Sequence, residues 1–415
     1  MANSILTPTV ITREAIRVLH GELSFLSNVN TQYDDRFANE GAKIGTSLNI
    51  RMPSKYTVRT GATLSAQDHV ERSTALAVAS QYGVDVSFTS VELTMSLDDF
   101  SKRIISPAMK QLAAKLEGDA LVVAKNWVAN YTGTTSTQMS YKQFAQGSQR
   151  LTENLAPSGD RTALLNPLSR VEFSDAVKGL FHDSTGVKEL YKEGIMGRTG
   201  GFTVYENTFL PSHTVGNSIT MGTPLVTGTP GTTTTSNAYV ATTDVDVDGL
   251  TSGVGLSQGD IVTISSVFDV HPETKVSTGV LKRFVIRNST TTVVTAGTIT
   301  LTLSPGIMSG SGNAYQNVNA APANNATVTR VGVENTSYGQ CLQFHKDAFA
   351  FATADLVDVS KFGAWGARQS MDGISMRIAK QYAISSDTVP CRIDVLWGFA
   401  PLYPELAVRG WHSLT

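Results

Sequence analysis

Residues 98–130, DDFSKRIISPAMKQLAAKLEGDALVVAKNWVAN, carry the strongest helical pattern in the chain. Their apolar residues recur in nearly one stripe, and Asp98 and Asp99 stand where a helix N-terminus favours anions. Pro107 either starts the main body of this helix or bends it. At 1.5 Å per residue, an unbroken helix from Asp98 to Asn130 would be roughly 50 Å long. That is longer than most compact domains need.

The segment before this helix, residues 46–97, alternates apolar and polar residues as strands do. Leu48, Ile50 and Met52 begin the pattern, and it resumes at Val84 after a polar tip that runs from Arg59 to Ala79. Because an isolated two-stranded ribbon is only marginally stable, we expect the ribbon to lie on a neighbouring subunit. Residues 1–45, with a short helical pattern over 11–26, predict an arm that also needs a partner surface.

The remaining sequence predicts a host domain interrupted by an insertion. Residues 136–212 mix helix and strand patterns, with a helix expected over 171–181 after Asn166-Pro167 and a strand over 202–205. Mixed α+β character returns in residues 337–415, which lack an obvious core of their own. We therefore expect 136–212 and 337–415 to pair as one discontinuous domain, next to the helical segment 98–135.

Residues 213–336 differ from their surroundings in composition. Eight of the sixteen residues 220–235 are threonine, and the segment continues as one short strand after another until a loop or linker at 309–327. This pattern predicts a separate all-β domain, a small barrel, inserted into the host. An insertion is tolerated when its two ends lie close together.

The bulk composition favours a protein whose faces are covered by copies of itself. The 415 residues suffice for two or three cores, and charged residues make up only 16% of the chain, against roughly 25% in a typical soluble domain. A formal net charge of −2 gives no positive field for holding phosphate backbones. With neither a signal-peptide pattern in residues 1–12 nor an apolar run of about 20 residues, we expect no secretion signal and no membrane span.

Cysteine and histidine usage gives little support to metal or redox chemistry. Cys341 and Cys391 lie in alternating apolar segments, which predicts buried free thiols in a protein made in a reducing cytoplasm. The seven histidines are scattered, and neither a zinc-ligand spacing nor a phosphate-binding glycine loop occurs. We therefore expect no cofactor.

Two local motifs resemble functional sites, but each lacks a feature that its site requires. Residues 255–259, GLSQG, match a nucleophile elbow, but a strand rather than a helix is expected after them, so we interpret them as a plain turn. Asp244, Asp246 and Asp248 begin like a calcium-binding loop, but Gly255 stands where the bidentate glutamate belongs. The three aspartates are a weak metal candidate; the favoured interpretation is the solvated face of a strand.

Several segments in the second half resemble the tailed-bacteriophage major capsid proteins of the HK-ninety-seven-like fold, in the subgroup of the Salmonella podovirus coat protein, which carries an inserted β-barrel domain. The resemblance is strongest over residues 255–410. It is carried by 259–264 (GDIVTI), 270–275 (VHPETK), 277–279 (STG), 303–305 (LSP), 344–349 (FHKDAF), 368–377 (RQSMDGISMR), 390–398 (PCRIDVLWG) and 404–407 (PELA). In the first half the match is one of organisation.

The resemblance implies an α+β phage capsid fold with no catalytic residues. Residues 1–45 would be the N-terminal arm, 46–97 the E-loop, 98–135 the spine helix and part of the P-domain, 136–212 with 337–415 the A-domain and P-domain, and 213–336 the inserted barrel. Expected partners are copies of the chain in hexamers and pentamers, a scaffolding protein, a portal protein, decoration proteins and packaged double-stranded DNA touched weakly by the inner face. The chain would be made in the bacterial host cytoplasm and end in the virion capsid.

Identical subunits in a shell occupy slightly different environments, so some parts must adjust. Our candidates for these flexible parts are the ribbon tip from Arg59 to Ala79 and the helix bend near Pro107. Other proteins would also fit parts of the sequence. An encapsulin-like compartment shell shares the host fold, a tail fibre or adhesin would explain the threonine-rich region, and an enzyme with an accessory β-domain lacks a coherent catalytic set.

Overall fold

The computed structural model describes residues 8–31, 47–64, 66–67, 72–89, 101–133, 139–177, 197–216, 223–228, 230, 240–250, 255–288, 292–293, 298–310, 312–357, 359–362, 365–371, 373–381 and 388–414. The chain divides into two compact units. Unit 1 draws on residues 1–50, 75–120 and 349–400, and unit 2 on residues 51–74, 121–348 and 401–415. In the described part of the chain, none of the helices has both the length and the apolarity that a membrane crossing requires.

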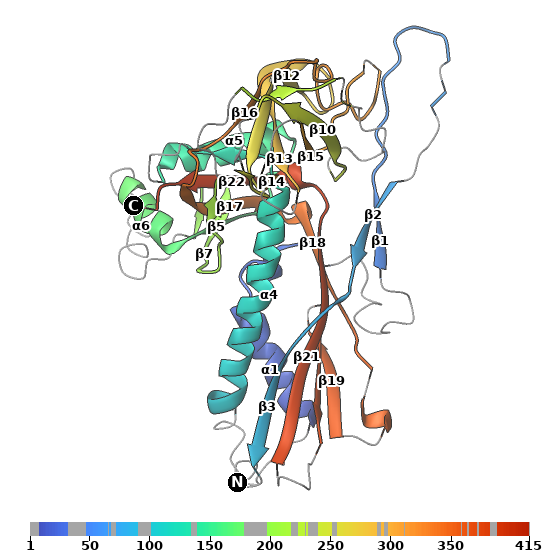
Figure 1. Cartoon of the computed structure of the whole chain (residues 1–415). Helices are drawn as coiled ribbons and strands as arrows, with labels where there is room; N and C mark the ends of the chain where they lie inside the picture. Colours follow the sequence, from blue (N-terminus) through green and yellow to red (C-terminus); the bar gives the residue numbers. More distant parts are fainter. Residues whose placement is uncertain are drawn as a thin grey trace. The chain divides into compact units, whose positions relative to one another are not determined.

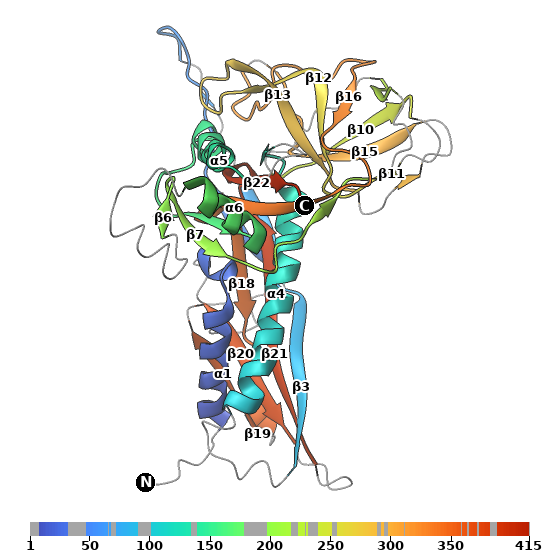
Figure 2. The ribbon, with the colours of Figure 1, turned by 90° about the vertical axis from the view of Figure 1, so that its left-hand side faces the viewer.

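Unit 1 is a five-stranded sheet that carries two helices (Figures 1 and 2). The strands lie in the order β18-β21-β20-β19, and β3 pairs with β21 in antiparallel register from Ser80 opposite Trp397 to Thr89 opposite Thr388. Their bounds are β3 Ser80–Thr89, β18 Phe349–Ala354, β19 Trp365–Met371, β20 Ile374–Lys380 and β21 Thr388–Pro401, with a 3₁₀ turn at Val359–Phe362.

Helix α1, Pro8–Glu22, packs against β19 and β20 of the same chain. Its helical spacing buries Ile11, Ile16 and Leu19, each exposed by 3% or less. A 3₁₀ turn at Leu26–Asn28 follows, held by the carboxylate of buried Glu117. The prediction that this region needs a partner surface is therefore wrong for residues 8–31, because the apolar face of α1 finds its cover within unit 1.

The long helix is shorter than predicted. Helix α4 runs over Ser106–Trp127, a π-helical turn at Ser101–Ile105 precedes it, and Asp98 and Asp99 lie outside the described residues. Pro107 is exposed in the first turn of α4, where its missing N–H breaks no helical hydrogen bond, so it starts the helix rather than bending it. The helix ends before Asn130, whose amide donates to the carbonyls of Glu405 (3.0 Å) and Ala407 (3.3 Å).

The predicted ribbon has a different second strand. Strand β1, Ser47–Met52, pairs with β2, Arg72–Ala77, so the connection between them ends before Ala79. The predicted second strand from Val84 onward is β3, which leaves the ribbon and joins β21 instead. The alternating pattern showed which residues share a face, but it carried no information about the neighbouring strand. The end of the predicted ribbon, residues 90–97, lies outside the described residues.

Unit 2 contains a host sheet ordered β4-β22-β17-β5-β7-β6, with β8 paired to β17; Figure 1 labels β22, β17, β5 and β7 of this sheet. Strand β17 pairs with both β5 and β22, so residues 337–348 and 401–415 join the segment before Pro211 in one sheet. Residues 349–400 belong to unit 1 instead, so the expected pairing of 337–415 with 136–212 holds only for the two ends of that segment. The bounds are β4 Tyr131–Thr132, α5 Tyr141–Glu153, β5 Arg161–Leu165, α6 Pro167–Val177, β6 Arg198–Thr199, β7 Phe202–Glu206, β8 His213–Thr214, β17 Ser337–His345 and β22 Ala407–His412, with 3₁₀ turns at Lys346–Ala348 and Pro404–Leu406.

The predicted helix after Asn166-Pro167 is confirmed, although it starts earlier, at Pro167, and residues 178–181 lie outside the described part. The Asn166 side-chain oxygen accepts from the Ser169 N–H at 2.8 Å, as a helix N-cap does. The strand expected at 202–205 is β7. Both cysteines are buried and free, as predicted.

The rest of unit 2 is a nearly closed six-stranded barrel in the order β16-β12-β13-β15-β10-β9. Its two ends meet because Leu225 bridges Thr327, and the N–H of Val226 donates to the Ala326 carbonyl at 2.9 Å. The loop at 312–327 packs Val318 into the apolar core of the barrel. The strands are β9 Leu225–Val226, β10 Thr243–Asp248, β12 Ile261–Val270, β13 Ser277–Ile286, β15 Ile299–Ser304 and β16 Val328–Arg330, beside the small pair β11 Gly255–Leu256 and β14 Thr292–Val293.

Candidate functional site: the junction of barrel and host

The weak metal candidates lie on a strand. Asp244 and Asp246 project from the exposed face of β10, where they accept hydroxyl hydrogen bonds from Thr302 (2.7 Å) and Thr300 (2.6 Å) of β15. Asp248 ends the same strand. The interpretation as a solvated strand face is confirmed. No group of three or more His, Cys, Asp or Glu side chains in the described ranges is arranged to hold a metal ion.

The nucleophile-elbow motif is a turn that leads into a strand. Its serine donates its backbone N–H to the Asp260 carboxylate at 2.9 Å, and β12 begins at Ile261. Gly259 has φ +94°, and a Cβ there would stand 2.9 Å from Asn126 Oδ1 and 3.2 Å from the His213 ring. The plain-turn interpretation is confirmed, and the glycine is needed because the backbone passes close to the host.

The three candidates for flexible positions do not form one site. Arg59 is exposed in the connection between β1 and β2, in unit 2, and its guanidinium donates to the Gly61 carbonyl. Ala79 and Pro107 are also exposed, but they belong to unit 1. Ala79 separates β2 from β3, at the point where the chain changes strand partner. Their role as adjustable positions stays a prediction.

A buried carboxylate, Asp260 at the start of β12, ties the barrel to the host. It is fully buried and accepts from His213 Nε2 of β8 at 2.8 Å, from the Gly216 N–H at 3.2 Å and from the Ser257 N–H at 2.9 Å. Burial lowers the pKa of His213, and the hydrogen bond to Asp260 opposes that shift. A buried charge needs partners of this kind, because an unpaired carboxylate in the interior is costly.

A second buried charge, Arg409 on β22 of the host, faces the same turn. Its guanidinium donates to the Gly259 carbonyl at 3.0 Å, and burial lowers its pKa to about 9 although Asp260 acts in the opposite direction. Lys125 on α4 belongs to the same group of charges. Burial lowers its pKa to about 8, Arg409 lowers it further, and Asp260 raises it. Asp260 therefore offsets the charge of cations that come from the host.

A ring of amide and guanidinium contacts continues the junction along the end of α4. Asn126 donates to Gln258 at 3.0 Å, Gln258 donates to the Arg287 carbonyl at 3.0 Å, and Arg287 donates back to the Asn126 carbonyl at 2.7 Å. The Arg287 guanidinium also lies 3.9 Å from the centre of the Trp127 ring. These directional contacts fix how the barrel is oriented on the host.

Aromatic packing closes the apolar side of the junction. Trp411 of β22 stacks on Tyr338 of β17, with ring centres 5.3 Å apart, and both pack with Val215 and Ile261 in one buried cluster. Ile261 comes from the barrel, while Trp411 and Tyr338 come from the host. The contact therefore joins the two parts by apolar burial as well as by hydrogen bonds.

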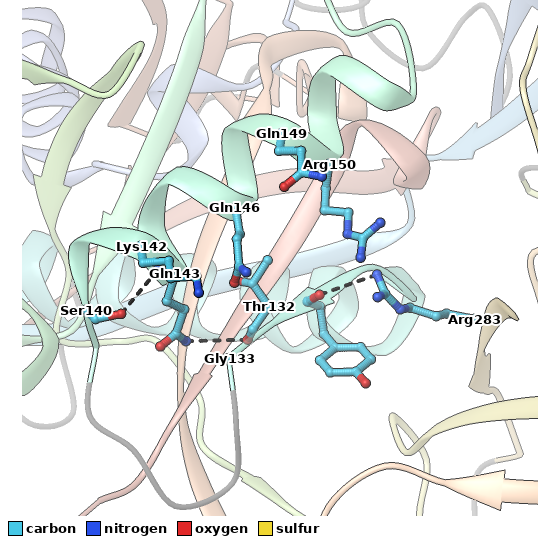
Figure 3. Close-up of a pocket in the computed structure, with 10 residues that line it drawn as sticks. Thr132, Gly133, Ser140, Lys142, Gln143, Gln146, Gln149, Arg150 and Arg283 are labelled. Atoms are coloured by element: carbon cyan, nitrogen blue, oxygen red, sulfur yellow. Dashed lines mark hydrogen bonds between the residues drawn. The ribbon is translucent and has the colours of Figure 1, made fainter. Parts of the chain in front are cut away.

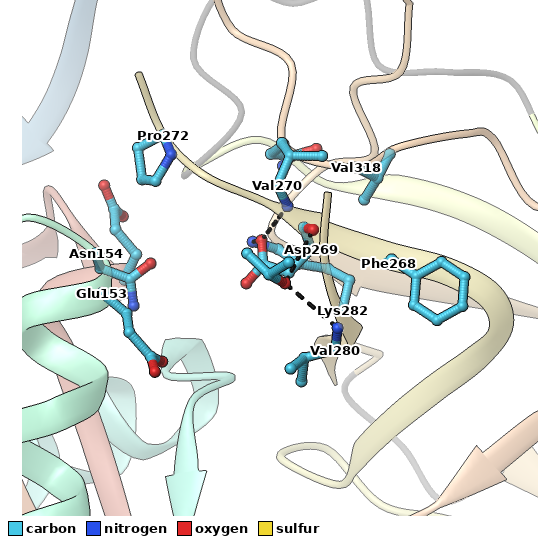
Figure 4. Close-up of polar contacts among 12 residues, drawn as sticks. Glu153, Asn154, Phe268, Asp269, Val270, Pro272, Val280, Lys282 and Val318 are labelled. Carbon is cyan, nitrogen blue, oxygen red and sulfur yellow. Dashed lines mark hydrogen bonds and ion pairs between the residues drawn. The ribbon is translucent and has the colours of Figure 1, made fainter. Parts of the chain in front are cut away.

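On the other side of the junction, polar side chains lie between α5 and the β12–β13 hairpin (Figure 4). We call this region, which includes Glu153, Asp269, Lys282 and Glu405, the seam. Lys282 of β13 pairs with Asp269 of β12 at 2.8 Å, beside a cavity of about 200 Å³ that Glu153 of α5 and the C-cap residue Asn154 also line. Farther along the seam, Lys282 and Glu405 line a smaller cavity. Burial raises the pKa of Glu405 to about 8, and its Oε2 atom has no hydrogen-bond partner in the described part of the chain.

The root of the ribbon is also fastened within unit 2. The Lys55 N–H donates to the Tyr315 hydroxyl at 2.6 Å, and the Arg72 guanidinium lies over the Tyr315 ring. Tyr315 belongs to the loop between β15 and β16 of the barrel. The first described residues after β1 and the start of β2 are therefore held by one aromatic side chain.

Sequence reasoning missed the junction residues. Asp260 lies 47 residues after His213 in the sequence, and Arg409 follows about 150 residues after Asp260. Each is a single residue that belongs to no recognisable motif. The available signal was the sequence GDIVTI at 259–264, which places a charged residue directly before a strongly apolar strand. A charge at the head of a buried strand must find a partner, but the sequence did not indicate which one.

Comparison with known proteins gives the family. The model described as P22 coat protein, gene protein 5, matches residues 7–410. The chain belongs to the P22 coat protein family. It is a structural major capsid protein of a bacteriophage, found in the virion capsid as a shell of its own copies. The resemblance and the α+β capsid fold inferred from the sequence are thereby confirmed, and the phage-capsid function is supported over the alternatives.

Several solved structures are similar to this coat protein. A chain from Mycobacterium phage Che8 is 12% identical, with a TM-score of 0.46 and coverage of 94% of this chain and 90% of that one. The capsid of cyanophage P-SCSP1u is 11% identical, with a TM-score of 0.40 and coverage of 88% and 83%. The CUS-3 coat protein I-domain is 27% identical over 26% of this chain and 96% of that one, with a TM-score of 0.21. No curated protein matches.

Proposed function

We propose that this coat protein forms the hexamers and pentamers of an icosahedral shell around double-stranded DNA, with residues 213–336 as a barrel inserted into a discontinuous host. A scaffolding protein would guide assembly, a portal would occupy one vertex, and decoration proteins would bind outside. Residues 1–45 would serve as the arm, 46–97 as the E-loop, 98–135 as the spine and part of the P-domain, and 136–212 with 337–415 as the A-domain and P-domain.

The observation that carries the insertion is the pairing of the strands that flank the barrel. His213 and Thr214 of β8 lie opposite Tyr338 and Ser337 of β17, and the Thr214 and Ser337 hydroxyls are 2.6 Å apart. The chain therefore leaves the host and returns to it on adjacent strands. Two ends that lie this close allow a domain to be inserted without opening the host fold. Because β8 belongs to the host sheet, the inserted part starts after Thr214.

The ribbon supports contact between subunits. Its described connection exposes three large apolar side chains, with exposed fractions of 59% for Tyr56, 97% for Val58 and 82% for Leu64. Apolar side chains gathered on an extended segment gain free energy when another surface covers them. We infer that a second copy of the coat protein provides that surface. In a shell, several weak contacts of this kind act together on each subunit.

Electron microscopy of the full chain, expressed with the genes that neighbour its own, tests shell formation. Closed particles of uniform diameter would support the proposal, and persistent monomers or trimers in the presence of a scaffolding partner would contradict it. Particles that contain an enzyme instead of DNA would support the alternative of an encapsulin-like compartment shell.

Replacing Val58 and Leu64 together with aspartate tests the ribbon contact. We expect the yield of closed particles to fall sharply while the circular dichroism of the subunit stays unchanged. The matched control is Val276→Asp, at a site that is 65% exposed in the turn between β12 and β13. Equal particle yields for both variants would show that the ribbon makes no contact that assembly needs. Stiffening the connection at Arg59 with proline tests its flexibility, because unchanged particle size and yield would contradict that role.

A further inference from the structure

A polar cavity of about 390 Å³ lies between α5, β4 and β13 in unit 2 (Figure 3). Helix α5 contributes Lys142, Gln146 and Arg150, β4 contributes Tyr131, and β13 of the barrel contributes Arg283. Figure 3 shows Arg150 and Arg283 reaching the cavity from two different elements. The cavity belongs to neither the buried junction around Asp260 nor the ribbon.

The cavity gathers positive charge. Lys142, Arg150 and Arg283 line it, and no carboxylate is among the described residues that do. Arg283 is half-buried, and its guanidinium lies 3.5 Å from the Tyr131 carbonyl oxygen and 4.7 Å from the centre of the Tyr131 ring. Burial lowers the pKa of Arg283 and the nearby charge of Arg150 lowers it further, while Tyr131, Asp269 and Glu153 act in the opposite direction. Two guanidinium groups that repel each other beside a cavity are unfavourable unless an anion lies between them.

The neighbouring acids compensate only part of this charge. Glu153 pairs with Arg150 at 2.8 Å and lies outside the lining. Asp269 pairs with Lys282. Lys142 and Gln146 also line the cavity, and no hydrogen bond or ion pair joins their side chains to the described residues.

We propose that this cavity binds a phosphate dianion, either free or as the terminal group of a nucleotide. Three cations line the cavity and Glu153 offsets one of them, so a ligand with two negative charges balances the remainder. The planar guanidinium groups of Arg150 and Arg283 match the geometry of phosphate oxygens, and Lys142 and Gln146 supply further donors. A phosphodiester carries a single charge and balances the site less well. The proposal is independent of shell formation, because all these residues belong to one subunit.

Isothermal titration calorimetry on the full, unassembled chain tests the proposal with inorganic phosphate as the probe. We expect one site per chain, and we expect Arg283→Gln to weaken binding about tenfold or more. Arg198→Gln is the matched control, because Arg198 is exposed on β6 and does not line the cavity. Lys142→Gln, at the exposed rim, is a second variant for the case that Arg283→Gln disturbs the fold. Its binding should also weaken, while that of the control should not change.

Two further titrations distinguish the sources of phosphate. A nucleoside monophosphate that binds more tightly than inorganic phosphate would assign the site to nucleotides, and equal affinities would assign it to the free ion. A DNA oligonucleotide without terminal phosphates should bind more weakly than either. If it binds more tightly, the cavity recognises the DNA backbone and the proposal is wrong. Absence of saturable phosphate binding, or equal binding by the wild type and both cavity variants, would also overturn it.

Discussion

The interior of the barrel and its junction with the host are stabilised in opposite ways. The core cluster of the barrel consists of apolar side chains, such as Phe284, Val245 and Leu301, each 1% exposed or less. The junction buries Asp260, His213 and Arg409 and links them to their surroundings with directional hydrogen bonds, although Nε and Nη1 of Arg409 have no hydrogen-bond partner among the described residues. Apolar burial is strong but non-directional, whereas buried charges tolerate few arrangements. We infer that the core holds the barrel together and that the junction determines how it is attached.

The largest effect should come from the core. Phe284→Ala should lower the free energy of unfolding by about 4 kcal/mol, because it removes a fully buried ring and leaves a cavity. Urea denaturation of the full chain, followed by circular dichroism, measures this. Val280→Ala on the same strand, at a site 42% exposed, is the control and should cost less than about 0.5 kcal/mol. Equal costs would show that the barrel does not depend on its core.

Asp260→Ala should cost about 3 kcal/mol, because it leaves Arg409 without its opposing charge and two backbone N–H groups without an acceptor. Because the junction attaches the barrel and the core holds it together, we expect the barrel to keep its strands in this variant. Protease cuts should instead appear in the segments that flank the barrel, near residues 216 and 331. Limited proteolysis with mass spectrometry locates the cuts. Loss of the barrel's own strands together with its attachment would show that the two regions are one cooperative unit.

The seam beside the barrel should respond to pH, and the apolar core should not. Because burial raises the folded-state pKa of Glu405 from 4.5 to about 8, the folded chain holds a proton that the unfolded chain releases. The stabilising contribution is complete below pH 4.5 and is lost as the pH rises through 8, and it amounts to a few kcal/mol. Denaturation midpoints at pH 5 and pH 8.5 measure this slope.

Glu405→Gln should remove most of that pH dependence, because the amide stays neutral at both values. Glu153→Gln changes an exposed carboxylate of the same seam and serves as the control. A slope that survives in Glu405→Gln would assign the pH dependence to other groups.

The smallest effect should come from the strand face of the barrel. Asp244→Ala removes one exposed contact to Thr302 and should change the free energy of unfolding by less than about 1 kcal/mol. Calcium should leave the melting temperature of the wild-type chain unchanged, because β10 presents its aspartates along an extended strand rather than around an ion. A calcium-dependent rise in melting temperature that Asp244→Ala abolishes would support calcium binding by these aspartates.

The sequence alone determined the features that depend on local periodicity. The apolar stripe around Leu112 and Leu116 predicted most of α4, the alternation of aspartate and valine predicted β10, and the change in composition after Pro211 predicted the barrel. Of the two roles that the sequence left open for Pro107, the start of the helix body is the one that the structure has, and the bend is not. These signals are readable because a helix or strand repeats its burial pattern every few residues.

Only the tertiary structure decided which segments meet. In the structure, β3 pairs with β21 and not with the ribbon, and α1 packs on β19 and β20 of its own chain. Asp260 of the barrel lies next to His213 and Arg409 of the host. A strand's pattern specifies which of its faces is buried, but not which strand lies beside it. A single buried charge likewise has no periodicity, so its partner becomes known only when segments as far apart as residues 260 and 409 have packed together.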